Sequence, residues 1–294
     1  MDGFRSGFVV VLGRPNVGKS TLTNALVGEK VAIVSPTAQT TRNRIMGVMT
    51  KEDYQVVLLD TPGIHTAFNK LGQYMMKAVD TAMEGIDALV FMLDAGDVRN
   101  TDWDLIKKYE KVRLPKFLVV NKVDTVDREQ LMPLLNSFND VEMDEVVPIS
   151  AKTGKGLDRL CELMHKVLPE GPKYFPDDMI TDQPERQIVA EMIREKALIN
   201  LREEIPHGIG VEIMAIEGQG GKGTVTIHAT VYCEKDSHKG MIIGKQGSML
   251  RKIGEAARRD IETLLGQKVN LQLWVKVRID WRNRIEDLRT LGYE

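Results

Sequence analysis

Gly13-Arg-Pro-Asn-Val-Gly-Lys-Ser20 is the segment that decides the fold of the first half of this 294-residue chain. It matches the phosphate-binding pattern G-x-x-x-x-G-K-[ST], follows the apolar run 8–12 and precedes a helix-like stretch at 20–26. In that context backbone amides surround the phosphates, Lys19 reaches the β- and γ-phosphates, and Ser20 ligates Mg²⁺. Taken alone, the motif fits an ATPase as well as a GTPase.

The residues around this loop predict an α/β domain with a doubly wound, mostly parallel sheet. Near-continuous apolar runs, typical of strands buried on both faces, occur at 8–12, 55–59, 88–93, 116–120 and 145–149. Helix-sized segments such as 20–26, 73–83 and 102–111 separate them. This strand–helix alternation predicts parallel strands covered by helices.

Three further motifs follow predicted strands and together predict a guanine-nucleotide site. Asp60-Thr-Pro-Gly63 places a carboxylate near Mg²⁺ and the Gly63 amide near the γ-phosphate. Asn121-Lys-Val-Asp124 supplies a carboxylate that accepts two hydrogen bonds from guanine but not from adenine. Ser150-Ala-Lys152 supplies backbone amides toward the guanine oxygen. The predicted nucleotide-binding residues are Gly13, Arg14, Pro15, Asn16, Val17, Gly18, Lys19, Ser20, Thr21, Asp60, Thr61, Pro62, Gly63, Asn121, Lys122, Asp124, Ser150, Ala151 and Lys152.

These motifs leave open which residues complete the Mg²⁺ shell and assist hydrolysis. Thr41 is the threonine expected to complete the Mg²⁺ shell with Ser20 and Asp60, and Thr40 is the alternative. Ile64 occupies the position where many small GTPases place a water-orienting glutamine, so intrinsic turnover should be slow. Asn16 either holds a monovalent cation near the phosphates or only stabilises its loop. Lys19, Thr41, Gly63 and Asn16 are therefore the predicted catalytic residues.

A linker and a second domain follow. Three prolines fall within residues 169–176, which cannot continue a helix or a central strand. After this linker, the sequence predicts a helix at 184–204, strands at 210–216 and 224–233, and a glycine-bearing loop at 240–247. A helix at 248–265, a strand at 268–279 and a helix at 281–291 follow. We therefore expect a nucleotide domain at 1–170, a linker at 171–184 and a small α+β domain at 185–294.

Gly244-Lys-Gln-Gly247 predicts RNA binding in this second domain, as the G-x-x-G turn of a K-homology module. A lone G-x-x-G is weak evidence, but residues 235–289 hold 13 Lys and Arg against 7 Asp and Glu. The charges on the following helix, Arg259 included, are alternatively a solvated face, and Trp274 and Trp281 are more often core than base-stacking residues. The predicted RNA-binding residues are Ile242, Ile243, Gly244, Lys245, Gln246, Gly247, Arg251, Lys252 and Arg258.

Composition restricts the class of protein further. The chain is 43% apolar and 28% charged, with net charge −2, and is typical of a soluble globular protein. No apolar stretch approaches the roughly 18 residues that a membrane helix needs. The two cysteines and five histidines lack metal-ligand spacing, so we assign no transition-metal site.

Together these residues resemble a known family. The segments GRPNVGKS, AQTTRNRI, DTPG followed by an apolar residue, and NKVD are similar to translation-factor-related GTPases, and EGPKYFP, TDQPER and GMIIGKQG are similar to the Era family in particular. The resemblance implies a cytoplasmic bacterial GTPase with Mg²⁺, with K⁺ on Asn16 and with a type II K-homology domain.

The same resemblance implies that the domain binds the 3′ end of 16S ribosomal RNA during small-subunit biogenesis, with some peripheral contact at the inner membrane. We expect a monomer. An RNA-binding scaffold that uses guanine nucleotide only as a structural ligand is the competing hypothesis, and a membrane-docked signalling GTPase is a third.

Overall fold

The computed structural model describes residues 3–37, 39–64, 67–202, 205–218 and 223–293. Contacts group the chain into two compact units. The first unit comprises 1–32, 41–66 and 75–182, and the second comprises 33–40, 67–74 and 183–294. Residues 33–40 and 67–74 thus belong by their contacts to the second unit, although both precede residue 170 in the sequence.

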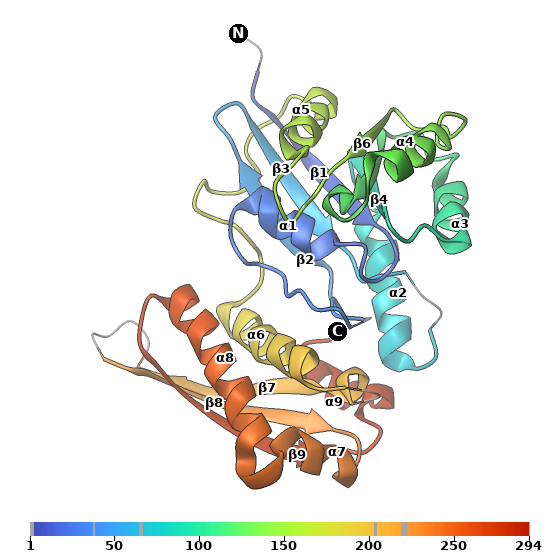
Figure 1. The fold of residues 1–294 in the computed structure, drawn as a ribbon. Helices are drawn as coiled ribbons and strands as arrows, with labels where there is room; N and C mark the ends of the chain where they lie inside the picture. The colour runs from blue at the N-terminus through green and yellow to red at the C-terminus, as the bar shows by residue number, and fades with distance from the viewer. Residues whose placement is uncertain (1–2, 38, 65–66, 203–204, 219–222, 294) are drawn as a thin grey trace. The chain divides into compact units, whose positions relative to one another are not determined.

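The first unit is built on a six-stranded sheet of order β2-β3-β1-β4-β5-β6, shown in Figure 1. β2 pairs antiparallel with β3, and the other neighbours are parallel. The predicted α/β class is confirmed, and β2 is an antiparallel edge strand that the apolar runs did not predict. The elements are β1 (Arg5–Leu12), α1 (Lys19–Val27), β2 (Ile45–Thr50), β3 (Tyr54–Asp60), α2 (Lys70–Ala82), β4 (Ala88–Asp94), α3 (Asn100–Tyr109), β5 (Lys116–Asn121), α4 (Arg128–Asn136), β6 (Glu145–Pro148) and α5 (Leu157–Val167).

Helices cover both faces of this sheet, which is why its central strands are apolar at nearly every position. One face packs on α1 and α5, and the other packs on α2, α3 and α4. Every residue of β3 and β5 is buried. Parallel strands end at one edge, so the loops after β1, β3 and β5 meet there and carry the predicted motifs.

The second unit is a three-stranded sheet of order β7-β8-β9. β8 pairs antiparallel with β7 and parallel with β9. One face of the sheet packs on α6 and α8 (Figure 1). The elements are α6 (Glu185–Asn200), β7 (Gly210–Glu217), β8 (Val225–Cys233), α7 (Asp236–Ile243), α8 (Ser248–Leu265), β9 (Val269–Val277) and α9 (Ile285–Thr290). The predicted α+β class is confirmed. The first helix ends at Asn200, and its predicted residues 203–204 lie outside the described residues.

Two local expectations were wrong in this unit. Residues 240–243 were expected in the loop at 240–247, yet they form the last turn of α7, which is helical up to Ile243. Trp274 was expected in the core, but 45% of it is exposed. Trp281 is fully buried and donates its Nε1 hydrogen to the Gly208 carbonyl at 2.9 Å, which confirms its core position.

Two general features concern the described parts of both units. Within them, no helix combines the length and apolar character needed to cross a bilayer. Within the same residues, no three His, Cys, Asp or Glu side chains gather closely enough to hold a metal ion.

Candidate functional site

The phosphate loop lies between β1 and α1 and leaves no room for side chains at two glycines. A Cβ on Gly13 would lie 2.6 Å from the Met92 carbonyl oxygen, and one on Gly18 would lie 2.3 Å from Asn121 Nδ2. Gly18 also has φ 106°, in the left-handed region that favours glycine. The Lys19 ammonium donates to the Gly13 and Arg14 carbonyls at 3.0 Å each, inside the loop. The lysine is thereby held over the loop that is predicted to bind phosphates.

Three hydroxyl and carboxylate side chains converge beside this lysine. Ser20 Oγ donates to Asp60 Oδ2 at 2.6 Å, and Thr41 Oγ1 lies 2.8 Å from Ser20 Oγ. Asp60 Oδ1 is buried and accepts no hydrogen bond from the residues that the structure describes. Hard oxygen donors with an unused carboxylate oxygen suit Mg²⁺. Thr41, rather than Thr40, is the threonine that joins this cluster, because the Thr40 hydroxyl bonds to the Thr37 carbonyl instead.

Burial shapes the charges of this cluster. Desolvation lowers the pKa of Lys19 to about 8, and the nearby Asp60 carboxylate opposes that change. Desolvation likewise raises the pKa of Asp60 to about 6, against the Lys19 charge and the Ser20 hydrogen bond. Without a ligand, burial therefore disfavours the charged forms of both side chains. Phosphate oxygens and a divalent cation are the ligands that would relieve this cost.

The loop after β3 closely approaches the phosphate loop. The Thr61 hydroxyl donates to the Val11 carbonyl at 2.7 Å, and the Ile64 amide donates to the Gly13 carbonyl at 3.3 Å. A Cβ on Gly63 would lie 2.7 Å from the Pro15 ring, so glycine is required for this approach. Ile64 packs against the apolar cluster on one sheet face and offers no polar atom for orienting water.

The predicted base-recognition motifs meet at Asn121. Its Nδ2 donates to the Val17 carbonyl at 2.8 Å, and its Oδ1 accepts the Ala151 amide at 2.9 Å. One buried side chain therefore joins the phosphate loop to the loop after β6. A hydrogen bond from Ser150 lowers the pKa of Asp124, which keeps that carboxylate ionised as an acceptor.

The remaining predicted residues surround these contacts. Lys122 Nζ bonds to the Asn16 carbonyl at 2.8 Å and to Asp94 Oδ2 at 2.6 Å, so the lysine fixes the loop on one side. Asn16 is exposed and adopts φ 67°. Pro62 is buried, Thr21 lies in the first turn of α1, and Lys152 is exposed.

An ion pair behind the phosphate loop was not predicted. Arg14 Nε donates to Asp102 Oδ1 at 2.6 Å, and the Asp102 side chain is 1% exposed. Asp102 Oδ2 also accepts the Arg99 amide at 2.9 Å, at the start of α3. Arg14 and Asp102 are 88 positions apart, so no local pattern could have paired them.

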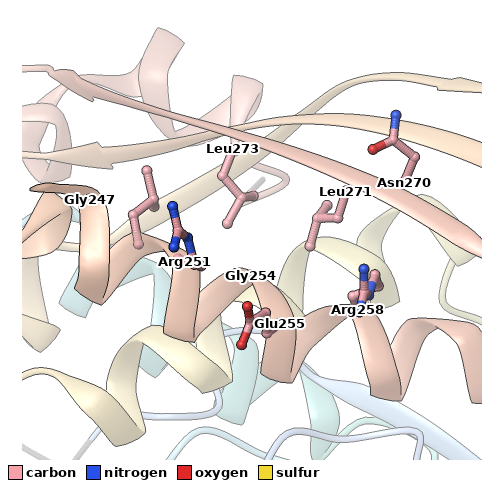
Figure 2. Close-up of a pocket in the computed structure, with 9 residues that line it drawn as sticks. Gly247, Arg251, Gly254, Glu255, Arg258, Asn270, Leu271 and Leu273 are labelled. Atoms are coloured by element: carbon pink, nitrogen blue, oxygen red, sulfur yellow. The ribbon is translucent and has the colours of Figure 1, made fainter.

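The second unit contains a groove of about 330 Å³ between α8 and β9 (Figure 2). The turn at its start needs unusual backbone angles: φ is 73° at Gly244, 52° at Gln246 and 78° at Gly247. Gly254 allows β9 to approach, because a Cβ there would lie 3.3 Å from Leu273. The lining residues are Gly247, Leu250, Arg251, Gly254, Glu255, Arg258, Asn270, Leu271 and Leu273.

Only some of the basic residues of α8 line this groove. Arg251 and Arg258 line it, whereas Lys252 is not among the lining residues, nor is Arg259, whose Nε bonds to the Glu255 carbonyl. Figure 2 shows Arg251 and Arg258 along the side of α8 that lines the pocket. Helix periodicity explains the division, since positions 251, 254, 255 and 258 share one face.

One predicted contact is wrong in detail. Ile242 is fully buried in the core of the second unit, so it supports the groove and cannot touch a base. Ile243 is half-buried against the same core. The apolar wall comes instead from Leu250, Leu271 and Leu273, which sequence reasoning missed. Lys245 and Gln246 lie in the turn that leads into α8.

Comparison with known proteins agrees with both halves of this description. Residues 8–122 match the family described as 50S ribosome-binding GTPase, and residues 204–282 match the KH domain family. GTPase Era of Clostridium tetani strain Massachusetts/E88 is 51% identical over 293 residues, covering 99% of each chain. GTPase Era of Clostridioides difficile strain 630 is 50% identical, again covering 99% of each chain.

Solved structures extend the likeness to three dimensions. A crystal structure of Era with MgGDPNP and nucleotides 1506–1542 of 16S ribosomal RNA has TM-score 0.94, 41% identity and 99% coverage of both chains. A crystal structure of a point variant of Aquifex aeolicus Era bound to GDP.AlF4⁻ has TM-score 0.93 at the same identity and coverage. With relatives this similar over its whole length, the chain belongs to the Era family of GTPases and carries that family's KH RNA-binding domain.

Proposed function

We propose that this GTPase hydrolyses GTP slowly and binds the single-stranded 3′ end of 16S ribosomal RNA, promoting biogenesis of the small ribosomal subunit. One observation carries the proposal. The groove between α8 and β9 is lined by two arginines, one glutamate, one asparagine and three leucines beside a G-x-x-G turn, so its charged side chains carry a net charge of +1. Such a groove suits unstacked bases with phosphates along its edge. A relative 41% identical over 99% of the chain has been solved with nucleotides 1506–1542 of that RNA.

The nucleotide residues have distinct roles in this proposal. Ser20, Thr41 and Asp60 hold Mg²⁺, which when bound neutralises charge on the β- and γ-phosphates. Lys19 binds the phosphate oxygens, and the Gly63 amide contacts the γ-phosphate. Asp124 selects guanine by accepting two hydrogen bonds from its edge. These roles are supported by the 2.6–2.8 Å contacts among the three Mg²⁺ candidates and by the unused Asp60 oxygen.

Slow turnover follows from the absence of a polar side chain at Ile64. Asn16 would hold K⁺ near the phosphates, where a positive charge in addition to Mg²⁺ and Lys19 would stabilise the charge that develops during transfer. Its exposed position in the phosphate loop supports this role.

We also propose that the nucleotide state changes RNA binding. Residues 33–40 immediately precede Thr41 and belong to the second unit by their contacts. The Val34 amide donates to Glu195 Oε1 at 2.9 Å, and Arg194 donates to the Thr40 carbonyl. Both partners lie on α6, which packs on the sheet of the RNA-binding unit. A change at Thr41 on hydrolysis would therefore pull on a segment that this helix holds.

The expected cellular setting completes the proposal. The enzyme would act as a monomer in the cytoplasm, where the small subunit is assembled. Peripheral contact with the inner membrane stays a prediction from the resemblance alone.

RNA binding is tested by two matched double variants on one helix. Arg251→Gln with Arg258→Gln removes two charges from the groove, and Lys252→Gln with Arg259→Gln removes two charges outside it. If the groove holds phosphates, the first pair lowers the slope of log affinity against log salt by about 1.4. The second pair should change it far less. Equal effects of both pairs on a labelled 16S 3′-end RNA would contradict the groove.

Hydrolysis and coupling need separate measurements. Single-turnover cleavage of GTP in K⁺ and in Na⁺ buffers, with and without RNA, tests the enzyme and the cation. Asn16→Ala should abolish the difference between K⁺ and Na⁺. Comparing RNA affinity with GDP and with a non-hydrolysable GTP analogue tests coupling, and equal affinity would leave an RNA-binding GTPase without a switch.

A further inference from the structure

Strand β9 has two differently used faces. Leu271 and Leu273 on one face line the groove against α8, and Figure 2 shows both directed toward that helix. The alternate residues Gln272, Trp274 and Lys276 lie on the opposite face, because successive side chains of a strand alternate. Asn270 lines the groove as well, but Figure 2 shows its side chain directed away from α8. β9 is also an edge strand of the sheet. A chain held in the groove therefore has a short path around this edge to the other face.

Trp274 makes that other face unusual. Trp274 is 45% exposed, and its ring stacks on His228 of β8, with ring centroids 5.6 Å apart and planes inclined by 22°. The two nearly parallel rings pack against each other on the side of the sheet opposite the one that packs on α6 and α8, and part of Trp274 stays exposed there. Exposing apolar indole surface to water is costly, so a ligand that covers Trp274 gains free energy.

The residues around Trp274 favour RNA over an apolar partner. Strand register places Thr226 beside Asn270, His228 beside Gln272 and Tyr232 beside Lys276. Within these two fully described strands, this face carries hydroxyl, amide, imidazole and ammonium groups and no carboxylate. The acids of the sheet lie on the far strand, where Glu212 accepts the Tyr232 hydroxyl at 2.7 Å. An aromatic surface with a lysine and hydrogen-bonding side chains matches single-stranded nucleic acid.

We propose that RNA leaving the α8–β9 groove passes around the edge of β9 and stacks one base on Trp274. Lys276 contacts the neighbouring phosphate, and Asn270 and Gln272 provide hydrogen bonds to base edges. The second surface rests on the proposed function, because it extends RNA that the groove already holds. It lengthens the bound segment beyond the four nucleotides that a K-homology groove clamps.

The test uses the full chain with Mg²⁺ and a non-hydrolysable GTP analogue. Three labelled RNAs from the 16S 3′ end are compared: a four-nucleotide core, and the same core extended by four nucleotides on its 5′ or its 3′ side. Trp274→Ala should weaken one extended RNA by about 5- to 100-fold and leave the core RNA unchanged. Trp274→Phe should restore most of the loss. Met214→Ala is the matched control, because Met214 is 49% exposed on β7 of the same sheet.

Tryptophan fluorescence gives an independent readout. The extended RNA should quench emission in the natural chain, the core RNA should not, and Trp274→Phe should abolish the difference. Unchanged binding of both extended RNAs by Trp274→Ala would overturn the proposal, as would an equal loss for core and extended RNAs. Weaker binding to purified small subunits with unchanged binding to free RNA would assign the surface to a protein and also overturn it.

The two proposals fail separately. If Arg251→Gln with Arg258→Gln leaves the core RNA unaffected, the groove itself is wrong. If that pair weakens the core RNA while Trp274→Ala changes nothing, the groove stands and the second surface falls.

Discussion

Arg14 Nε lies 2.6 Å from Asp102 Oδ1, which ties the phosphate loop to the first turn of α3. The Arg14 carbonyl also accepts the Lys19 ammonium at 3.0 Å. Asp102→Asn should therefore lower the free energy of unfolding by about 2 kcal/mol, because the Arg14 guanidinium loses its closest counter-charge and keeps only Asp97, at 3.6 Å. It should also weaken GDP binding, since Arg14 and Lys19 share the loop.

Asp104→Asn on the same helix is the matched control, since Asp104 is exposed. Chemical denaturation and GDP titration measure the two effects. A variant Asp102→Asn with natural stability and natural affinity would show that the pair contributes nothing to the loop.

Base selection should follow the side chain at Asp124. Asp124→Asn replaces an acceptor pair with one acceptor and one donor, so guanine loses a hydrogen bond and xanthine, with a carbonyl in place of the amine, gains one. We expect GDP affinity to fall at least tenfold and XDP affinity to rise, as measured by competition with a fluorescent nucleotide. Parallel losses for GDP and XDP would mean that the residue supports the loop without selecting the base.

Coupling between nucleotide and RNA should depend on Arg194. Its guanidinium is buried, pairs with Glu191 and donates to the Thr40 carbonyl. Arg194→Met should bring RNA affinities with GDP and with a GTP analogue to the same value, and Arg194→Lys should retain part of the difference.

The exposed Arg202→Met serves as the control for that experiment. Thermal unfolding identifies any variant that simply fails to fold. An undiminished nucleotide effect in a folded Arg194→Met protein would remove α6 from the coupling.

Ionisation of Tyr232 should destabilise the second unit at high pH. Burial, with the hydrogen bond to Glu212, raises the pKa of Tyr232 from about 10 to about 12. The neutral phenol is favoured in the folded state, so its contribution is complete below pH 10 and is lost as the pH rises toward 12. Absorbance titration of tyrosinate should show that Tyr232→Phe removes a step near pH 12. If Tyr232→Phe instead removed a step near pH 10, Tyr232 would not have a raised pKa in the folded protein.

The nucleotide site was predictable because its motifs follow buried strands that are recognisable as apolar runs. The carboxyl ends of parallel strands meet at one edge, so Ser20, Asp60 and Asn121 converge as expected. The Arg14–Asp102 pair was not predictable, because a long-range contact leaves no local pattern. The roles assigned to the individual site residues stay predictions until binding is measured.

The second unit was predictable in class and less so in detail. α7 begins with polar residues and contains Gly240, so neither periodicity nor propensity indicated a helix. Ile242 looked like a groove residue, yet the same helix turns it into the core. Trp274 was expected in the core because alternation is ambiguous when one face of a strand meets a groove and the other meets solvent.

The parallel pairing of β8 with β9 has a consequence for synthesis. The two strands are separated by α7 and α8, so β8 lacks this neighbour until residues 269–277 have left the ribosome that makes the chain. The buried Trp281 and Tyr293 come later still. Since amino-terminal domains fold first during translation, a nascent chain has a complete nucleotide sheet well before it has an RNA groove. A newly made molecule is therefore expected to bind GTP before it can bind RNA.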